Sequence, residues 1–260
     1  MALAVHEARS MDISPISQTA HRVASTFHRG LAAVALVALA LTGAPSVAAA
    51  AAAPSDQSVL PAEQHTSEKG RRLASAYGGA LRDLSAKIYH CVPWVEVKRN
   101  GIGFYKPKHL EGDVRYLSVN LYVDQQPSQE FAAFTTEERA SRMFSRYVGP
   151  MLKRMSRPSG LLADPGLDGF TVILEWLKQV PATASARPVH ETIAVFLERP
   201  VVADYIGGRI GGRDLATRGR VLGWDGETAL GPLRLASWDD DFVSTYKVSN
   251  YQLAPGVSCP

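Results

Sequence analysis

Residues 113–124 read DVRYLSVNLYVD, and this stretch decides the kind of fold to expect. Four aliphatic residues share one face of an extended chain: Leu117, Val119, Leu121 and Val123. Four residues with hydroxyl or amide groups share the opposite face: Tyr116, Ser118, Asn120 and Tyr122. A period of two predicts a β-strand with one buried face and one face that carries tyrosine and amide groups.

Amphipathic helices are predicted on both sides of this strand. Before it, residues 67–89 repeat apolar side chains at spacings of three and four. After it, Thr135 and Glu138 form a capping box that opens a second helix. Pro150 lies inside the second helix and predicts a kink or a break near Val148.

The remaining strands are predicted from shorter patterns and from turn signals. Asn100-Gly101 and Asp225-Gly226 are strong hairpin signals, so each predicts a turn between two strands. The other predicted strands are residues 92–99, 169–178, 190–199, 220–224, 227–236 and 242–253. Residues 200–220 are expected to form a short helix that breaks into a glycine loop.

These elements predict an α+β fold, in which an antiparallel sheet of about six to eight strands carries two main amphipathic helices. The order helix, strand, strand occurs twice, and a C-terminal β-hairpin region follows. The order has two interpretations: two α-β-β pseudo-repeats, or an ordinary antiparallel α+β arrangement.

The N-terminal region has the order of a secretory signal peptide. Residues 31–41 are an unbroken apolar run of about 11 residues, whereas a membrane-spanning helix needs about 20. Arg29 precedes this run, and Pro45 and a series of small residues follow it. We therefore expect residues 1–53 to be a signal peptide, cleaved between about residues 48 and 53, with translation starting at Met1 or Met11.

A signal peptide implies a periplasmic or secreted protein. Residues 54–65 then read as a linker, and residues 66–260 as a single α+β domain. The chain has two cysteines, Cys91 and Cys259, and an oxidising compartment favours a disulfide between them.

Charge restricts the class of partner. The formal net charge is only +3, so a nucleic-acid binder is not expected, and no transmembrane segment is predicted in the mature chain. Four arginines nevertheless crowd one glycine-rich segment and form a candidate site for an anionic partner: Arg209, Arg213, Arg218 and Arg220. A flexible, solvated turn is the alternative interpretation.

The sequence contains no assembled catalytic motif, no metal-ligand spacing and no cofactor motif, so no catalytic residue, metal or cofactor is assigned. We expect a non-catalytic binding or accessory protein with an unknown extracytoplasmic partner. The alternative is a cell-envelope hydrolase whose catalytic groups come together only in three dimensions. The residues whose positions bear on this choice are the arginines of 199–220 and Glu96, Glu175, His190 and Glu191.

Overall fold

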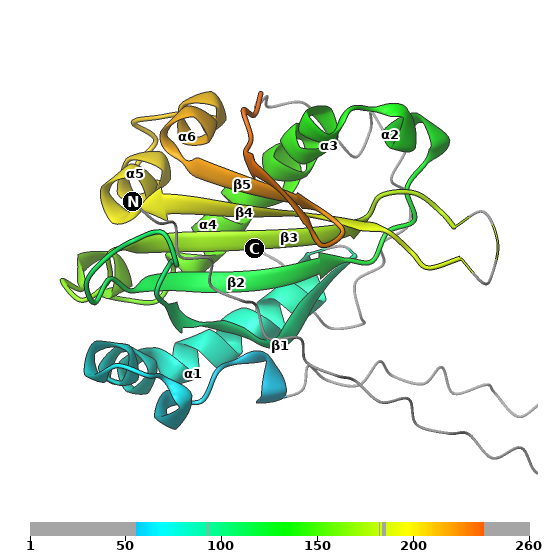
Figure 1. The fold of residues 1–260 in the computed structure, drawn as a ribbon. Coiled ribbons are helices and arrows are strands. Elements are labelled where there is room, and N and C mark those ends of the chain that lie inside the picture. The colour runs from blue at the N-terminus through cyan, green and yellow to red at the C-terminus, as the bar shows by residue number, and fades with distance from the viewer. Residues whose placement is uncertain (1–55, 93, 182, 184–185, 237–260) are drawn as a thin grey trace, which may run out of the picture. The chain divides into compact units, whose positions relative to one another are not determined.

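The computed structural model describes residues 56–92, 94–181, 183 and 186–236. Their centre is a six-stranded sheet with the strand order β1-β2-β3-β4-β5-β6 (Figure 1). The strands are β1 (Val95–Tyr105), β2 (Tyr116–Val123), β3 (Gly169–Leu177), β4 (His190–Glu198), β5 (Arg220–Asp225) and β6 (Thr228–Pro232). Helices accompany the sheet, so the α+β class is confirmed.

The sheet is mixed, which corrects the expectation of purely antiparallel pairing. Neighbouring strands are antiparallel except β2 and β3, which run parallel. A long helical connection joins these two strands, and such a crossover returns the chain to the end of the sheet where β2 began. Strands β3 and β4 therefore run in the opposite directions to β1 and β2, respectively. The interpretation as two pseudo-repeats stays unconfirmed.

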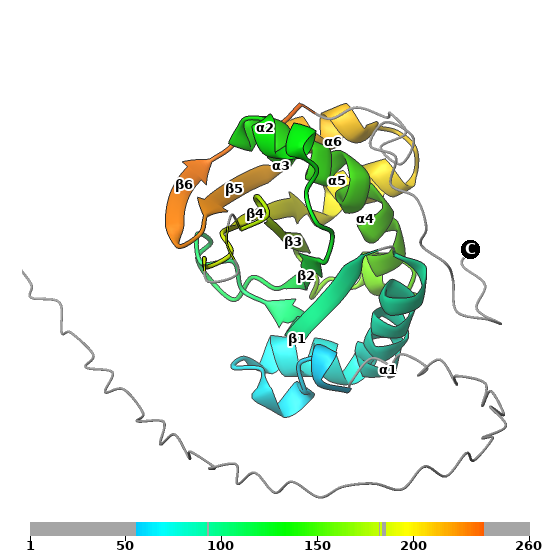
Figure 2. The same cartoon turned by 90° about the vertical axis from the view of Figure 1, so that its right-hand side faces the viewer.

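The helices with four or more residues are α1 (Glu68–Cys91), α2 (Gln129–Ala133), α3 (Thr136–Met143), η3 (Phe144–Val148), α4 (Gly149–Met155), α5 (Arg199–Ile206) and α6 (Gly212–Arg218). The described residues also form three short 3₁₀ turns: η1 (Asp56–Ser58), η2 (Ala62–Gln64) and η4 (Leu161–Ala163). Helices α1 and α4 lie on the same face of the sheet (Figure 2).

The core lies between this helical layer and the sheet. The odd-numbered residues of β2, from Leu117 to Val123, are fully buried in it, as the alternating pattern predicted. Phe170, Val172 and Leu174 of β3 are buried in the same core. The even-numbered residues of β2 therefore face the other side of the sheet.

Asn100-Gly101 does not form the predicted hairpin turn. Strand β1 continues through both residues, and its pairing with β2 shifts register between Val97 and Ile102. Asn100 has a φ of 52°, the left-handed conformation that also makes an Asn-Gly pair suitable for a turn. Here that conformation is used for a β-bulge, and the connection to β2 comes after Tyr105.

The predicted second helix begins and breaks where its sequence signals lie. Thr135 caps α3 in a reciprocal capping box with Glu138. The break near Val148 is a π-helical segment, η3, which is followed by α4 with Pro150 in its first turn. Proline has no N–H to donate within the helix, so a locally wider turn at this point has a clear cause.

Two segments have more structure than the sequence predicts. Within the expected linker 54–65, residues 56–65 contain two 3₁₀ turns, and a bridge from Val59 to Ile102 attaches them to β1. The expected glycine loop contains helix α6, where the Asp214 side chain accepts a hydrogen bond from the Gly211 N–H. The Asp225-Gly226 turn joins β5 and β6 as predicted.

Several predictions fall outside the described residues. They are the signal peptide over residues 1–53, the strand over 242–253 and Cys259. The Cys91–Cys259 disulfide therefore stays a prediction.

Asp164 ties α1 to the chain that leads into β3. Its carboxylate accepts hydrogen bonds from Arg72 at 2.9 and 3.3 Å, from the Tyr77 hydroxyl at 3.2 Å and from the Gly166 N–H at 2.7 Å. The hydrogen bonds from Arg72 are the main cause that lowers the pKa of Asp164 to about 2.

Replacing Asp164 by asparagine is expected to destabilise the protein by about 1 kcal/mol at pH 7, since Arg72 is half exposed and water screens part of the attraction. The carboxyl pKa is lower in the folded state than in the unfolded state, where it is about 4. Its stabilisation is therefore complete above pH 4 and is lost as the pH falls toward 2. Urea unfolding at pH 7 and pH 3 measures this change.

The matched control is Asp83→Asn, which removes an exposed carboxylate from α1 that makes no ion pair within the described residues. The stability difference between Asp164→Asn and the wild type must shrink at pH 3, while that of Asp83→Asn stays small at both values. An equal effect of the two substitutions would contradict the role of Asp164.

Candidate functional site

The face of the sheet opposite the core contains a cavity of about 480 Å³. Its floor is made by side chains of β2, β3, β4 and β5, and residues 105–109, where β1 ends and the connection to β2 begins, form one wall. This volume falls within the range of about 300–1,000 Å³ that is usual for small-ligand pockets. We take it as the candidate site.

The floor of the cavity is apolar toward β5 and polar toward β2. Its apolar residues are Ile173, Ala194, Phe196, Leu222 and Trp224. Its polar residues are Ser118, Asn120 and Thr171. Pairing of β2 with β3 places Ser118 beside Thr171 and Asn120 beside Ile173, so the polar groups form one continuous patch.

Two polar atoms in this patch are buried without a hydrogen-bond partner. They are Asn120 Oδ1 and Thr171 Oγ1, and no group within the described part of the chain bonds to either of them. A buried polar atom left unpaired costs about 1–3 kcal/mol, so native structures rarely keep one without a reason. A ligand that supplied a hydrogen bond here would remove this cost.

The wall of the cavity contains two titratable rings. His109 packs edge-on against Phe196 with ring centroids 4.7 Å apart, and burial, followed by the nearby Arg220 charge, lowers its pKa. Tyr105 donates its hydroxyl to the carbonyl oxygen of Asn100 at 2.5 Å, and burial raises its pKa. At neutral pH both rings are therefore uncharged and present polar edges rather than charges.

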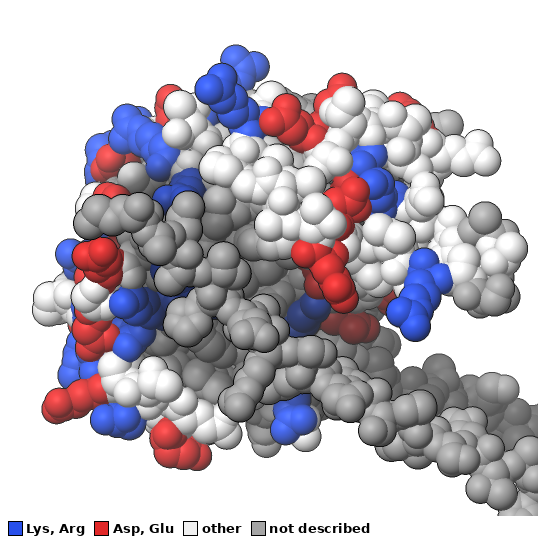
Figure 3. All heavy atoms as spheres, viewed as in Figure 1, with Lys and Arg blue, Asp and Glu red and all other residues white. Residues whose placement is uncertain are grey.

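Figure 3 shows the molecule from the side on which β2 to β5 face the viewer. Lys and Arg side chains gather on the left, where α5, α6 and the start of β5 lie in Figure 1, and Asp and Glu side chains lie among them. Charges of both signs are therefore mixed at that end of the molecule.

Two of the other hollows are weaker candidates. A groove of about 540 Å³ lies between residues 59–63 and α1, and a smaller cavity of about 200 Å³ lies between residues 125–128 and α3. Among the residues that the structure describes, no unpartnered buried polar atom lines either of them. Neither hollow shows the unmet hydrogen-bonding capacity of the sheet cavity.

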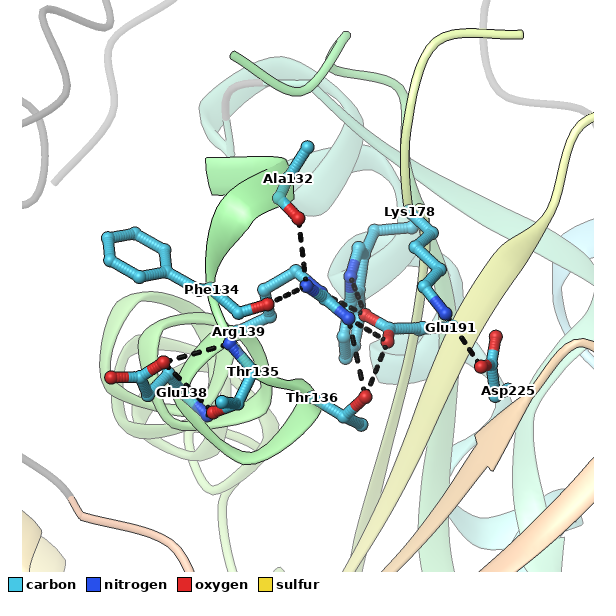
Figure 4. Close-up of polar contacts among 10 residues, drawn as sticks. Ala132, Phe134, Thr135, Thr136, Glu138, Arg139, Lys178, Glu191 and Asp225 are labelled. Atoms are coloured by element: carbon cyan, nitrogen blue, oxygen red, sulfur yellow. Dashed lines mark hydrogen bonds and ion pairs between the residues drawn. The ribbon is translucent and has the colours of Figure 1, made fainter. Parts of the chain in front are cut away.

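A buried ion pair joins α3 to β4 on the core side of the sheet (Figure 4). Arg139 Nε donates to one carboxylate oxygen of Glu191 at 2.6 Å, and Arg139 Nη2 donates to the other at 2.5 Å. Trp176 Nε1 donates to the same carboxylate at 3.1 Å, and the Thr136 hydroxyl donates to it at 3.0 Å. Each oxygen of Glu191 therefore has two donors.

The same arginine also holds the end of α2. Its Nη1 donates to the carbonyl oxygens of Ala132, at 3.2 Å, and of Phe134. Carbonyl groups at a helix C-terminus have no partner within the helix, so a cation there satisfies them. With every group paired and both charged side chains buried, we assign this network to stability and not to ligand binding.

The arginines of the candidate anion site do not converge on one point. Arg209 binds the Asp204 carboxylate at 2.6 and 2.8 Å, and Arg218 lies 3.7 Å from the same carboxylate. Arg213 lies on α6, whereas Arg220 begins β5. Asp204 thus occupies the place an anion would take between two of them, and the anion-site hypothesis stays a prediction.

The other titratable groups of interest are dispersed. Lys98 forms an ion pair with Glu175, and the Tyr122 hydroxyl lies 3.5 Å from His190 Nε2. Both pairs lie on the cavity face of the sheet but do not line the cavity. Glu96 lies opposite Tyr122 in the β1–β2 register.

Within the ranges described, no three metal-ligating side chains cluster, and none of the helices is both long and apolar enough to cross a membrane. Sequence reasoning missed the cavity, although it placed Asn120 on the polar face of its strand. Comparison of the chain with family models, with curated proteins and with solved structures gives no match.

Proposed function

We propose that this is an exported, non-catalytic binding protein that holds a small amphipathic molecule in the cavity of its sheet. The observation that carries the proposal is the pair of unpartnered polar atoms, Asn120 Oδ1 and Thr171 Oγ1, beside an apolar floor. A mainly apolar cavity with a few convergent polar groups is the usual form of a small-molecule site. Export is supported by the signal-peptide order of residues 1–53.

The wall and floor favour binding over the hydrolase alternative. A nucleophile needs a base within hydrogen-bonding reach, yet the Ser118 hydroxyl of the cavity donates to a backbone oxygen, that of Tyr116, at 3.4 Å. The ring of His109 packs on Phe196 and no side-chain carboxylate of the described chain is hydrogen-bonded to it. The site therefore offers recognition groups without an assembled nucleophile and base.

The test uses N-phenyl-1-naphthylamine, a neutral probe whose fluorescence rises in apolar sites. We expect saturable binding with one site per chain. Ala194→Phe and Leu222→Trp add volume at the floor and should each weaken binding at least tenfold. Fluorescence titration measures the affinities, and circular dichroism establishes that each variant is folded.

Thr171→Val provides a second readout that does not depend on blocking the cavity. It replaces an unpartnered hydroxyl by a methyl group of similar shape, so the ligand-free protein should become more stable by about 1 kcal/mol. Lys87→Gln, on the exposed side of α1, is the control and should change neither property. No saturable probe binding, or equal binding by both blocking variants and the wild type, would overturn the proposal.

A further inference from the structure

We infer that the cavity takes an anionic amphiphile, a single-chain molecule whose negative head lies beside Lys106, Lys108 and Arg220 and whose apolar body lies over Phe196 and Leu222. This inference rests on the proposed function and deepens it by naming the chemical class of the ligand.

Three cations lie at one end of the cavity. Lys106 and Lys108 belong to its wall. Arg220 pairs in register with Phe196, the residue on which His109 packs, and its charge acts on the His109 ring. Arg220 itself does not line the cavity, but it and the two lysines all lie near His109, the lysines along the same wall and the arginine on the neighbouring strand.

No carboxylate of the described residues neutralises these cations. Within the described ranges, none of the three has a carboxylate within ion-pair distance. Glu198, two residues beyond Phe196 on β4, does not line the cavity. An anionic head could therefore approach these cations without displacing a carboxylate of the described residues. Arg209 and Arg218 differ, because both lie within ion-pair distance of Asp204.

The wall between the charged end and the floor is suited to an amphiphile. The His109 ring is held uncharged by burial and by Arg220, so it adds an N–H edge beside the cations. Beyond it the floor is apolar, and each methylene group that enters contributes about 0.8 kcal/mol, which is about a fourfold gain in affinity. The cavity thus combines cations that favour a negative head group with an apolar floor that favours an alkyl chain.

The experiment compares three single-chain probes with alkyl tails of nine or ten carbons and different head groups: decanoate, decan-1-ol and decyltrimethylammonium. Each is titrated against bound N-phenyl-1-naphthylamine at low ionic strength, and displacement gives the affinity. We expect decanoate to bind about tenfold more tightly than decan-1-ol, and decyltrimethylammonium to bind most weakly. Added salt should reduce the advantage of decanoate, because the charges lie at the exposed end.

The variant that tests the assignment is Lys106→Gln with Lys108→Gln. It should weaken decanoate binding about tenfold and leave decan-1-ol unchanged, since each exposed charge pair contributes up to about 1 kcal/mol. The control, Arg82→Gln with Lys87→Gln, removes two exposed cations from α1 on the opposite side of the sheet and should change neither affinity.

The outcomes separate this inference from the proposed function. If the neutral probe binds but decanoate has no advantage over decan-1-ol, or if the lysine double variant keeps that advantage, the anionic class is wrong and the binding function stands. If N-phenyl-1-naphthylamine itself does not bind, the proposed function fails. Sedimentation of the protein with phosphatidylglycerol vesicles, unaffected by decanoate, would assign the cations to a bilayer surface and overturn the inference.

Discussion

Arg139→Met is expected to lower the free energy of unfolding by about 3–5 kcal/mol. The substitution leaves the Glu191 carboxylate buried with the Thr136 and Trp176 donors but without a compensating charge. It also leaves the carbonyl oxygens of Ala132 and Phe134 without their donor. Urea unfolding followed by circular dichroism measures the loss.

Glu191→Gln tests the same pair from the other side. The guanidinium of Arg139 then stays buried beside a neutral amide, and the expected loss is again about 3–5 kcal/mol. The double variant, Arg139→Met with Glu191→Met, removes both charges at once. Its loss should be smaller than the sum of the two single losses, because no uncompensated charge remains.

A second ion pair on the sheet supplies the matched control. Lys178, just after β3, and Asp225, at the end of β5, lie 2.7 Å apart. Their side chains are 28% and 30% exposed, and Figure 4 shows them beside the buried pair. Lys178→Met should cost less than about 1 kcal/mol, as is usual for exposed pairs. A loss for Arg139→Met no larger than that for Lys178→Met would refute the role of the buried network.

The position of Glu191 illustrates what a single sequence can and cannot predict. In the strand predicted over 190–199, Glu191 falls on the same face as Ile193, Val195 and Leu197, so its burial followed from the alternation that predicted the strand. The same alternation did not predict the ion-pair partner of Glu191. Arg139 is 52 residues away on a helix, and only the three-dimensional packing brings the two together.

The parallel pairing of β2 with β3 was missed for a related reason. Periodicity predicts that each strand exists and which face it buries, but it contains no statement about the direction of a neighbouring strand. The direction follows from where the helices between residues 124 and 168 deliver the chain. A long helical connection favours a parallel neighbour, and this signal was present in the sequence.

The sequence did not predict the cavity, but it did predict the polar strand face that forms part of its floor. The even-numbered residues of 116–122 were expected on a face with hydroxyl and amide groups, and Ser118 and Asn120 do form the polar part of the cavity floor. The wall was not predicted, because the Asn100-Gly101 signal placed the end of the first strand too early. The strand extends to Tyr105 instead, and the wall begins there.

Gly101→Ala is expected to destabilise the protein by about 2 kcal/mol, since added atoms in a packed site force backbone shifts. A Cβ atom at this position would lie 2.6 Å from the backbone oxygen of Lys98 and 2.8 Å from that of Asn120. Neither oxygen belongs to a side chain that can rotate away. The backbone of β1 or β2 must move, and thermal and urea unfolding measure the cost.

The control for this substitution is Gly79→Ala, at an exposed position inside α1 where a Cβ atom would meet nothing within 4 Å. It should stabilise the protein by up to about 1 kcal/mol, because alanine favours a helix over glycine. The two substitutions add the same methyl group. Opposite changes in the free energy of unfolding would therefore show that the loss at Gly101 comes from crowding at the β1 bulge. Because one crowded oxygen belongs to Asn120, Gly101→Ala should also weaken binding of N-phenyl-1-naphthylamine; unchanged stability and unchanged binding together would show that the bulge relaxes without moving the cavity floor.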